Sequence, residues 1–307
     1  MISKIKVITL LLLTFFQLSL YSLEKHILYS DIINRWGFQE FCDFRYIPTA
    51  DGFFEHKIYT FNPQEIQRGS TVFVNSSFVK DFFEKIHPKI KYPYILITHV
   101  YDWDMPGSFL KYLDDPKLHA WFTINPSLYE HPKLFPIPIG ILQQPFVNTQ
   151  KYKIKRTINR IKQTSVKKNL LYMNFNFNNL AERYQIYNMF NNKHFCFKSD
   201  SNKQFDDYLK EMAQSKFVLS PRGGGLDCYR TWEALLVGSI PIVKHSNLDC
   251  LYKDLPILII DSWEDITEEF LNTKYKEIIS KNYKIEKLFM GYWLKQILQQ
   301  KASTTNL

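Results

Sequence analysis

The sequence predicts an α/β protein made of two parallel-sheet lobes and a C-terminal helical tail. Three observations lead to this fold class. Short apolar runs typical of buried strands alternate with segments of helical periodicity, a pattern that favours parallel sheets covered by helices on both faces. A strongly basic segment divides this series into two halves. The chain has 307 residues, which is enough for two lobes of ordinary size.

In the first half, the apolar runs are short and are bounded by turn-forming residues, as strands usually are. One segment between them has the apolar spacing of a helix instead. We therefore expect a helix at about Phe78–Ile86 and strands at Thr71–Val74, Tyr94–Thr98, Ala120–Ile124 and Leu134–Ile137.

The second half repeats the alternation with clearer helices. Helical periodicity covers Ala181–Phe190 and Phe205–Met212, and the tail from Trp263 to Gln299 is mostly helical. The predicted strands are Leu170–Met173, a short one near Phe195, Phe217–Leu219, Ile240–Val243 and Pro256–Ile260. Alternating strands and helices imply a second parallel sheet.

The first residues resemble an export signal rather than part of the fold. Lys4 and Lys6 precede an apolar stretch, Val7–Leu20, and Ser22 offers a small residue for cleavage. The stretch is short for a membrane span, which needs about 20 residues. We expect an exported protein in a periplasm or secretory lumen, with Met1–Ser22 either cleaved or kept as a membrane anchor.

The net charge of +9 is concentrated in one segment between the two halves. Lys151–Lys168 contains eight basic residues and no acidic one. Such a run can bind acidic lipid or nucleic acid, but no zinc-ligand spacing or helix-turn-helix pattern supports nucleic-acid recognition. We expect an exposed linker that can also face an anionic acceptor, and no nucleic-acid partner. The expected divisions are residues 1–22 (signal), 23–150 (first lobe), 151–168 (linker), 169–285 (second lobe) and 286–307 (terminal helix and tail).

The stretch Phe217–Val243 carries the chemistry. Its first strand is followed by Gly223, Gly224 and Gly225, which let the backbone turn sharply and approach a ligand closely. In open α/β sheets, ligands bind at this place, beyond the carboxyl end of a strand and against a helix N-terminus. Asp227 is expected to cap the following helix, and Gly238 to end it.

Charged residues around this turn suit a nucleoside diphosphate. Arg222 and Arg230 offer planar donors for phosphate oxygens, and the glycine amides add neutral donors. Glu233 lies one helical turn beyond Arg230, where its carboxylate can accept from a ribose diol or simply pair with that arginine. The predicted substrate-binding residues are Ser220, Arg222, Gly223, Gly224, Gly225, Asp227, Arg230 and Glu233.

These residues resemble the signature of exostosin-type glycosyltransferases of family 47. The resemblance is strongest from Lys216 to Trp263, and Trp121–Gly140 is similar to bacterial members of the group. It rests on Ser220-Pro221-Arg222-Gly223, Arg230, Glu233-Ala234-Leu235, Gly238, Ile240-Pro241-Ile242-Val243, Asn125, His131-Pro132-Lys133-Leu134 and Pro136-Ile137-Pro138-Ile139-Gly140.

The resemblance implies a GT-B fold of two Rossmann-like lobes, in which the second lobe holds the donor and the last helix packs back onto the first lobe. It also implies a hexosyltransferase-type enzyme with a nucleoside diphosphate sugar as donor and a glycan or glycolipid acceptor. No obligatory cofactor or metal ligand set is implied. Two other functions stay open: a non-catalytic protein that binds carbohydrate or nucleotide, and a secreted protein that binds anionic polymer.

A catalytic base for an inverting transfer is expected from the first lobe, across the cleft from the donor. Asp102 follows the strand Tyr94–Thr98 and resembles an acidic residue that precedes a proline in related bacterial sequences, here Pro106. Asp102 is the predicted base, with His99 and Asp104 as alternatives. Asp102-Trp103-Asp104 also matches the metal-binding DxD pattern, although that pattern is a frequent chance match, and a capped turn is an equal alternative.

Two further expectations concern side chains that suit more than one role. Trp103 and Trp121 are expected in the core rather than on a sugar-stacking surface. The cysteines are expected to be mostly buried free thiols, and the first pair to test for a disulfide is Cys228 with Cys250.

Overall fold

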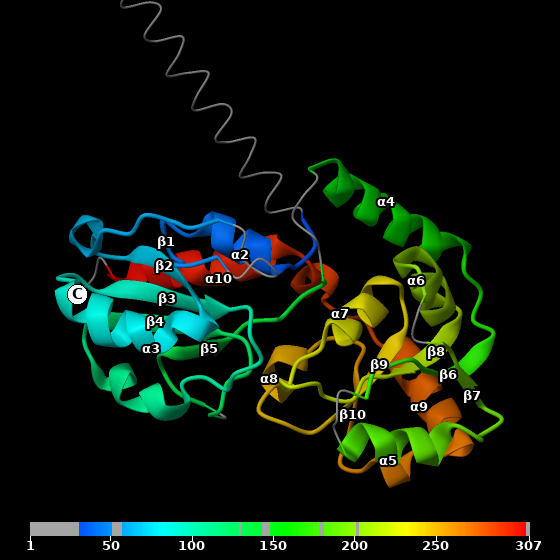
Figure 1. The fold of residues 1–307 in the computed structure, drawn as a ribbon. Coiled ribbons are helices and arrows are strands. Elements are labelled where there is room, and N and C mark those ends of the chain that lie inside the picture. Colours follow the sequence, from blue (N-terminus) through cyan, green and yellow to red (C-terminus); the bar gives the residue numbers. More distant parts are fainter. Residues whose placement is uncertain are drawn as a thin grey trace, which may run out of the picture.

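The computed structural model shows two α/β lobes side by side (Figure 1). It describes residues 31–50, 57–128, 130–142, 148–177, 181–200 and 203–304, with the side chains of the helix that begins at Asn148 described from residue 154 onward. The expected signal, Met1–Ser22, lies outside these residues. Within the described part of the chain, no helix is both long enough and apolar enough to cross a bilayer.

The first lobe is built on a parallel five-stranded sheet whose strand order follows the chain. All four strands expected from the sequence are confirmed, and one short strand, β1, precedes them. Every residue of β3 is buried because the sheet is covered on both faces. The strands are β1 (Phe44–Tyr46), β2 (Ser70–Asn75), β3 (Tyr94–His99), β4 (Leu118–Thr123) and β5 (Leu134–Pro136).

Short helices cover this sheet. The expected helix at Phe78–Ile86 is present, but it is divided into consecutive turns of 3-10, α and π type. A helix that the sequence did not predict, α2, begins after its N-cap Asn34. The elements are α2 (Arg35–Phe41), η1 (Pro63–Glu65), η2 (Ser76–Phe78), α3 (Val79–Asp81), η3 (Phe82–Ile86), η4 (His87–Lys89) and η5 (Gly107–Asp114).

The second lobe has its own parallel five-stranded sheet, in the order β10-β9-β8-β6-β7. All five strands expected from the sequence are confirmed within a few residues. The central strand β8 pairs with β6 on one side and with β9 on the other. The strands are β6 (Asn169–Met173), β7 (Cys196–Lys198), β8 (Ser215–Leu219), β9 (Ile240–Lys244) and β10 (Leu258–Ile260).

Helices alternate with these strands, as expected. Helix α7 ends where Gly238 adopts a φ of +78°, so the predicted stop at this glycine is confirmed. The elements are α5 (Ala181–Phe190), α6 (Phe205–Ala213), α7 (Tyr229–Leu236), α8 (Asp249–Tyr252), η6 (Trp263–Asp265), α9 (Glu268–Ile279) and η7 (Ile285–Leu288).

The basic segment Lys151–Lys168 corrects an expectation. Instead of an exposed linker, most of it forms helix α4 (Asn148–Thr164), which packs against α6. Ile158 and Ile161 are buried in that contact, and this apolar pair is what makes the segment helical despite its charge. Lys167 is also not a solvated linker residue: its ammonium donates to Ser215 O at 2.8 Å, and burial lowers its pKa to about 8.

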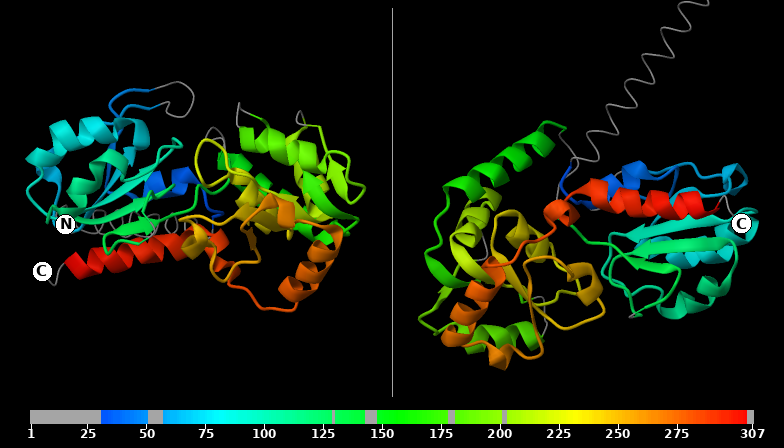
Figure 2. Two further views of the ribbon diagram at one scale, coloured as in Figure 1. Left: turned by 90° about the horizontal axis from the view of Figure 1, so that it is seen from below. Right: turned by 180° about the vertical axis from the view of Figure 1, so that it is seen from behind.

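The last helix, α10 (Met290–Ser303), returns to the first lobe (Figure 2). It contacts α2, β3 and β4. Met290 lies so close to Gly37 of α2 that a Cβ on this glycine would come within 2.7 Å of its sulfur. At the other end of the helix, Lys301 forms an ion pair with Asp43 at 2.8 Å. The prediction that the terminal helix packs onto the first lobe is confirmed.

Candidate functional site

The order of the second sheet identifies where a ligand fits. From β6 the chain moves outward to β7, whereas from β8 it continues in the opposite direction to β9 and β10. The crevice between the carboxyl ends of β6 and β8 is therefore a topological switch point, the usual ligand position in such sheets. The first sheet has no such point, because its strands lie in chain order. Fold topology thus favours the second lobe as the lobe that binds a ligand.

The turn after β8 begins with a fixed residue. Ser220 is buried, its amide donates to Ile242 O at 3.0 Å, and its hydroxyl lies 2.8 Å from the Thr231 hydroxyl. Ser220 thereby ties the end of β8 to β9 and to helix α7. This predicted substrate-binding residue holds the turn in place, and its hydroxyl is already used within the protein.

Arg183 on α5 holds the turn from the side of β6. Its Nε donates to Arg222 O at 2.9 Å and its Nη2 to Pro221 O at 3.4 Å, while Nη1 donates to Asn176 O. The side chain is buried, and a Cβ on Gly223 would lie 3.3 Å from Nη2. Burial, followed by the charge of Arg230, lowers the pKa of Arg183. A buried cation beside a second cation makes this crevice strongly electropositive.

Arg230, in the first turn of α7, is the second cation of the crevice. Its guanidinium lies 5.6 Å from the ring centroid of Phe175, and that of Arg183 lies 5.9 Å from the same ring. The Nε and Nη1 atoms of Arg230 are buried and have no hydrogen-bond partner among the described residues. Buried donors without an acceptor are costly, so these two atoms favour the binding of an acceptor group in the crevice.

Arg222 is exposed at the rim of the turn, where its Nη2 donates to Gly224 O at 3.0 Å. Among the described residues, Arg183, Arg222 and Arg230 form no ion pair with a carboxylate. Both arginines predicted to bind phosphate are therefore near the turn and have no carboxylate partner among these residues, and a third cation, Arg183, lies beside them.

Glu233 is buried one turn beyond Arg230. It forms no ion pair with that arginine; its Oε2 instead accepts from the Tyr208 hydroxyl at 2.9 Å. Burial raises the pKa of Glu233 to about 7, although the Tyr208 hydrogen bond and the charge of Arg230 act in the opposite direction. The alternative of a surface salt bridge between Arg230 and Glu233 is thus wrong.

Asp227 does not have either role expected for it. The N-cap of α7 is Cys228, and the Asp227 carboxylate is buried. Its oxygens accept from the Ile139 amide of the first lobe at 2.8 Å and from Trp232 Nε1 at 2.8 Å. Burial raises its pKa to about 6. With its oxygens used internally, Asp227 connects the two lobes and is not positioned to bind substrate.

Because the glycines have no side chains, side chains of the first lobe can approach the turn closely. A Cβ on Gly224 would lie 2.5 Å from Asp102 Oδ2, and one on Gly225 would lie 2.3 Å from Asn125 Nδ2. Asn125, with a φ of 51°, also accepts from the Asp227 amide at 2.9 Å. The close approach predicted for these glycines is therefore real, but in the structure the approaching atoms belong to the protein.

The predicted base and its alternatives lie in different environments. Asp102 and Asp104 are exposed on the loop that follows β3, and Asp102 faces the glycine turn. His99 is fully buried, and its Nδ1 accepts from the Val100 amide. Burial and the Arg35 charge lower the pKa of His99 to about 3. The alternative prediction of His99 as the base is therefore wrong, because its side chain is not accessible from the cleft. Trp103, expected in the core, is 52% exposed.

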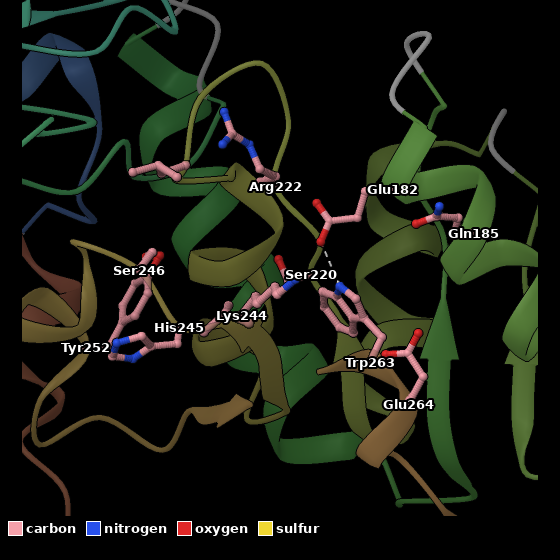
Figure 3. A pocket seen from close by; sticks show the side chains of 12 residues that line it. Glu182, Gln185, Ser220, Arg222, Lys244, His245, Ser246, Tyr252, Trp263 and Glu264 are labelled. Atoms are coloured by element: carbon pink, nitrogen blue, oxygen red, sulfur yellow. Dashed lines mark hydrogen bonds between the residues drawn. The ribbon is translucent and has the colours of Figure 1, made fainter. Parts of the chain in front are cut away.

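A pocket of about 440 Å³ lies on the other side of the turn, toward β9 (Figure 3). Arg222 overhangs it, Lys244 and His245 come from the end of β9, and the Trp263 indole donates to Glu182 at 2.9 Å. Its size is within the usual range for small-molecule sites. The pocket adjoins the crevice at Arg222, so one extended ligand can reach both.

Sequence reasoning missed several residues of this site. Phe175 follows a predicted strand by two residues, so the rule for strand ends would have found it. Arg183 lies in the first turn of a predicted helix. Acidic residues are favoured at that position, so an arginine there could have indicated a functional role. Tyr208 was predicted only as part of an apolar helix face. The four cysteines are free, so the Cys228–Cys250 disulfide is not formed.

Two parallel-sheet lobes in tandem, with a terminal helix that crosses back to the first, form the GT-B architecture of glycosyltransferases. The chain belongs to the family described as RXYLT1 C-terminal domain, which matches residues 148–303, more than half of its length. Family and fold together support a glycosyltransferase. This match does not confirm the exostosin-type resemblance in particular, which stays a prediction.

Solved structures with related folds are distant. "OtsA apo structure" has a TM-score of 0.42 at 9% identity, over 77% of this chain and 73% of that chain. The Candida albicans trehalose-6-phosphate phosphatase N-terminal domain has a TM-score of 0.37 at 11% identity, over 78% and 73%. For the GtfA/B complex the values are 0.34 and 11%, over 79% of this chain and 57% of that chain. No curated protein matches the sequence.

Proposed function

We propose that this protein is an exostosin-like, hexosyltransferase-type enzyme that moves a sugar from a nucleoside diphosphate sugar to a hydroxyl of a glycan or glycolipid. The observation that carries the proposal is Arg230, whose buried donors have no acceptor among the described residues, beside the second cation Arg183 at the switch point. Protein interiors rarely leave such groups unpaired unless a ligand completes them. A diphosphate has the charge and the oxygens that this crevice needs.

The donor would lie against the turn after β8. Arg230 and Arg222 would bind the diphosphate, with Arg183 fixing the carbonyls of the turn. Glu233 would accept from the ribose diol, and Tyr208 would orient its carboxylate. The pocket under Arg222 would take another part of the donor. The guanidinium charges would stabilise the diphosphate as it departs, which is the electrostatic role that catalysis requires.

The acceptor would enter from the first lobe. Asp102 faces the glycine turn across the interlobe contact, and this proximity supports it as the group that would accept a proton from a hydroxyl attacking a donor bound there. Exposed Trp103 beside it offers a flat apolar surface for a sugar ring. Asp104, on the same loop, is the remaining alternative base.

The donor site is tested by binding and transfer with UDP, GDP and CMP and their common sugars. Arg230→Ala should abolish transfer and weaken UDP or GDP binding, while the protein stays folded. Arg68→Ala is the matched control, because it removes an exposed arginine that precedes β2, at the opposite end of the first sheet from the Asp102 loop. If Arg230→Ala keeps full activity, the phosphate assignment is wrong.

The base is tested separately. Asp102→Asn should lower kcat by about 10²- to 10⁴-fold and leave nucleotide binding unchanged. Asp104→Asn serves as the control on the same loop. If Asp104→Asn shows the loss and Asp102→Asn does not, Asp104 is the base.

We also propose that the protein is exported to a periplasm or secretory lumen and is associated with a membrane through Met1–Ser22. The basic start and the apolar stretch Val7–Leu20 support this. Detection of the protein in the cytoplasmic fraction, with Met1 retained, would contradict it.

A further inference from the structure

Helix α4 has one apolar side and one basic side. Thr157, Ile158 and Ile161 are buried against the second lobe, whereas Arg156 and Arg160 are exposed on the opposite side. No acidic residue occurs from Lys151 to Lys168. The exposed side is therefore a cationic surface, which we call the α4 face. Its described members are Lys155, Arg156, Asn159, Arg160, Lys162 and Gln163.

Three of the charged side chains of the α4 face have no carboxylate partner in the part of the chain that the structure describes. Arg156, Arg160 and Lys162 form no ion pair with any described residue, although α4 packs on a helix that carries acidic groups. Two of these acids pair with other lysines, Asp207 with Lys210 and Glu211 with Lys203. Clustered cations repel one another, so a face of this kind is stabilised when it meets an anionic partner.

The location of the α4 face indicates which anionic partner it binds. Lys155 Nζ lies 5.8 Å from the centroid of the Phe289 ring, and Phe289 pairs with Ile32 near the start of the described chain. The first described segment and α4 lie on the same side of the molecule in Figures 1 and 2. The described chain therefore begins on the side of the molecule where α4 lies, and the apolar stretch Val7–Leu20 precedes this start by a short distance in the sequence.

We propose that the α4 face docks on the anionic phospholipid headgroups of the membrane to which the N-terminal segment delivers the protein. Basic side chains next to a membrane-attached segment are attracted to acidic lipids, and salt weakens this attraction. A nucleic acid would meet the same charge, but it would not account for the position of α4 on the side where the described chain begins. This docking does not depend on glycosyl transfer.

The test compares partition of the full chain onto two kinds of vesicle, phosphatidylcholine alone and phosphatidylcholine mixed with phosphatidylglycerol. The N-terminal segment is present in both measurements, so the ratio of the two partition coefficients isolates the electrostatic contribution. Arg156→Gln/Arg160→Gln/Lys162→Gln should lower this ratio by roughly 100-fold, as expected for three basic side chains at an anionic surface. Salt at about 1 M should abolish the preference.

A matched control removes the same charge elsewhere. Lys193, Lys276 and Lys281 are exposed residues outside α4, and the triple change to Gln should leave the ratio near that of the wild type. The proposal is overturned if the wild-type ratio is close to one, or if the control lowers it as much as the α4 variant does. Binding of RNA without binding to anionic vesicles would also overturn it.

Discussion

Asp102 of the first lobe lies directly against Gly224 of the second, so that a Cβ on this glycine would come within 2.5 Å of the Asp102 carboxylate. The predicted base and the turn that would hold the donor are thus in contact in the arrangement of the two lobes that the structure has. Next to them, Asn125 contacts Gly225 in the same way. The glycine turn is one of the places where the two lobes meet, and its lack of side chains permits this contact.

Gly225→Ala should destabilise the protein more than Gly224→Ala. The atom that a Cβ on Gly225 would meet belongs to Asn125, which is buried and is held by the Asp227 amide. Asp102 is exposed and can rotate away. Overpacking of a fixed site costs about 1–3 kcal/mol. Thermal denaturation of the two variants checks this, and equal melting temperatures would count against it.

Arg230→Met should stabilise the ligand-free protein by about 1–2 kcal/mol while it removes nucleotide binding. The reason is that the buried Nε and Nη1 donors lack an acceptor and lie beside the charge of Arg183. Chemical denaturation without nucleotide measures the effect. Arg183→Met is the control: it removes hydrogen bonds to three main-chain carbonyls and should destabilise. A less stable Arg230→Met protein would show that Arg230 has an internal partner after all.

Glu233→Gln should change how stability depends on pH. Burial raises the pKa of Glu233 from 4.5 to about 7, so its contribution to stability is fully present below pH 4.5 and is lost as the pH rises through 7. Gln can still accept from Tyr208 but does not ionise. The variant should therefore gain stability relative to the wild type between these pH values, by at most about 3 kcal/mol. Denaturation curves near pH 5 and near pH 8 measure the gain, and an equal difference at both pH values would contradict it.

Trp103→Ala should leave stability within about 0.5 kcal/mol of the wild type, because the indole is exposed. Trp121→Ala should cost about 3–5 kcal/mol, since this indole is fully buried and donates to Thr98 Oγ1 at 2.8 Å. Melting temperatures of the two variants provide the comparison. If Trp103→Ala were as destabilising as Trp121→Ala, the loop after β3 would be packed rather than available to an acceptor.

The regular elements could be predicted because each buried strand is a continuous apolar run and each long helix has a clear period. Helix α5 was predicted with the boundaries that the structure has, Ala181–Phe190. Strand β1 escaped prediction because it has only three residues, of which Arg45 is one. Helix α4 was predicted as a linker because its charge hides the apolar pair Ile158 and Ile161.

The site residues that could be predicted are those that belong to one local sequence motif. Arg222 and Arg230 are near the turn for that reason. Contacts between distant segments could not be predicted: Asp227 receives the amide of Ile139, and Arg183 reaches the carbonyls of the turn from another helix. His99 failed as a base because burial depends on what covers a strand end, and the strand itself does not encode this.

The return of α10 to the first lobe has a consequence for biosynthesis. Trp293, Leu294 and Ile297 fill the space beside β3 and β4, yet they follow the whole second lobe in the sequence, so a ribosome adds them after that lobe. The lobe that is translated first must therefore wait, with part of its apolar surface uncovered, until the second lobe has been made. Chains released early would expose that surface, so a premature stop before Met290 should yield an aggregating product.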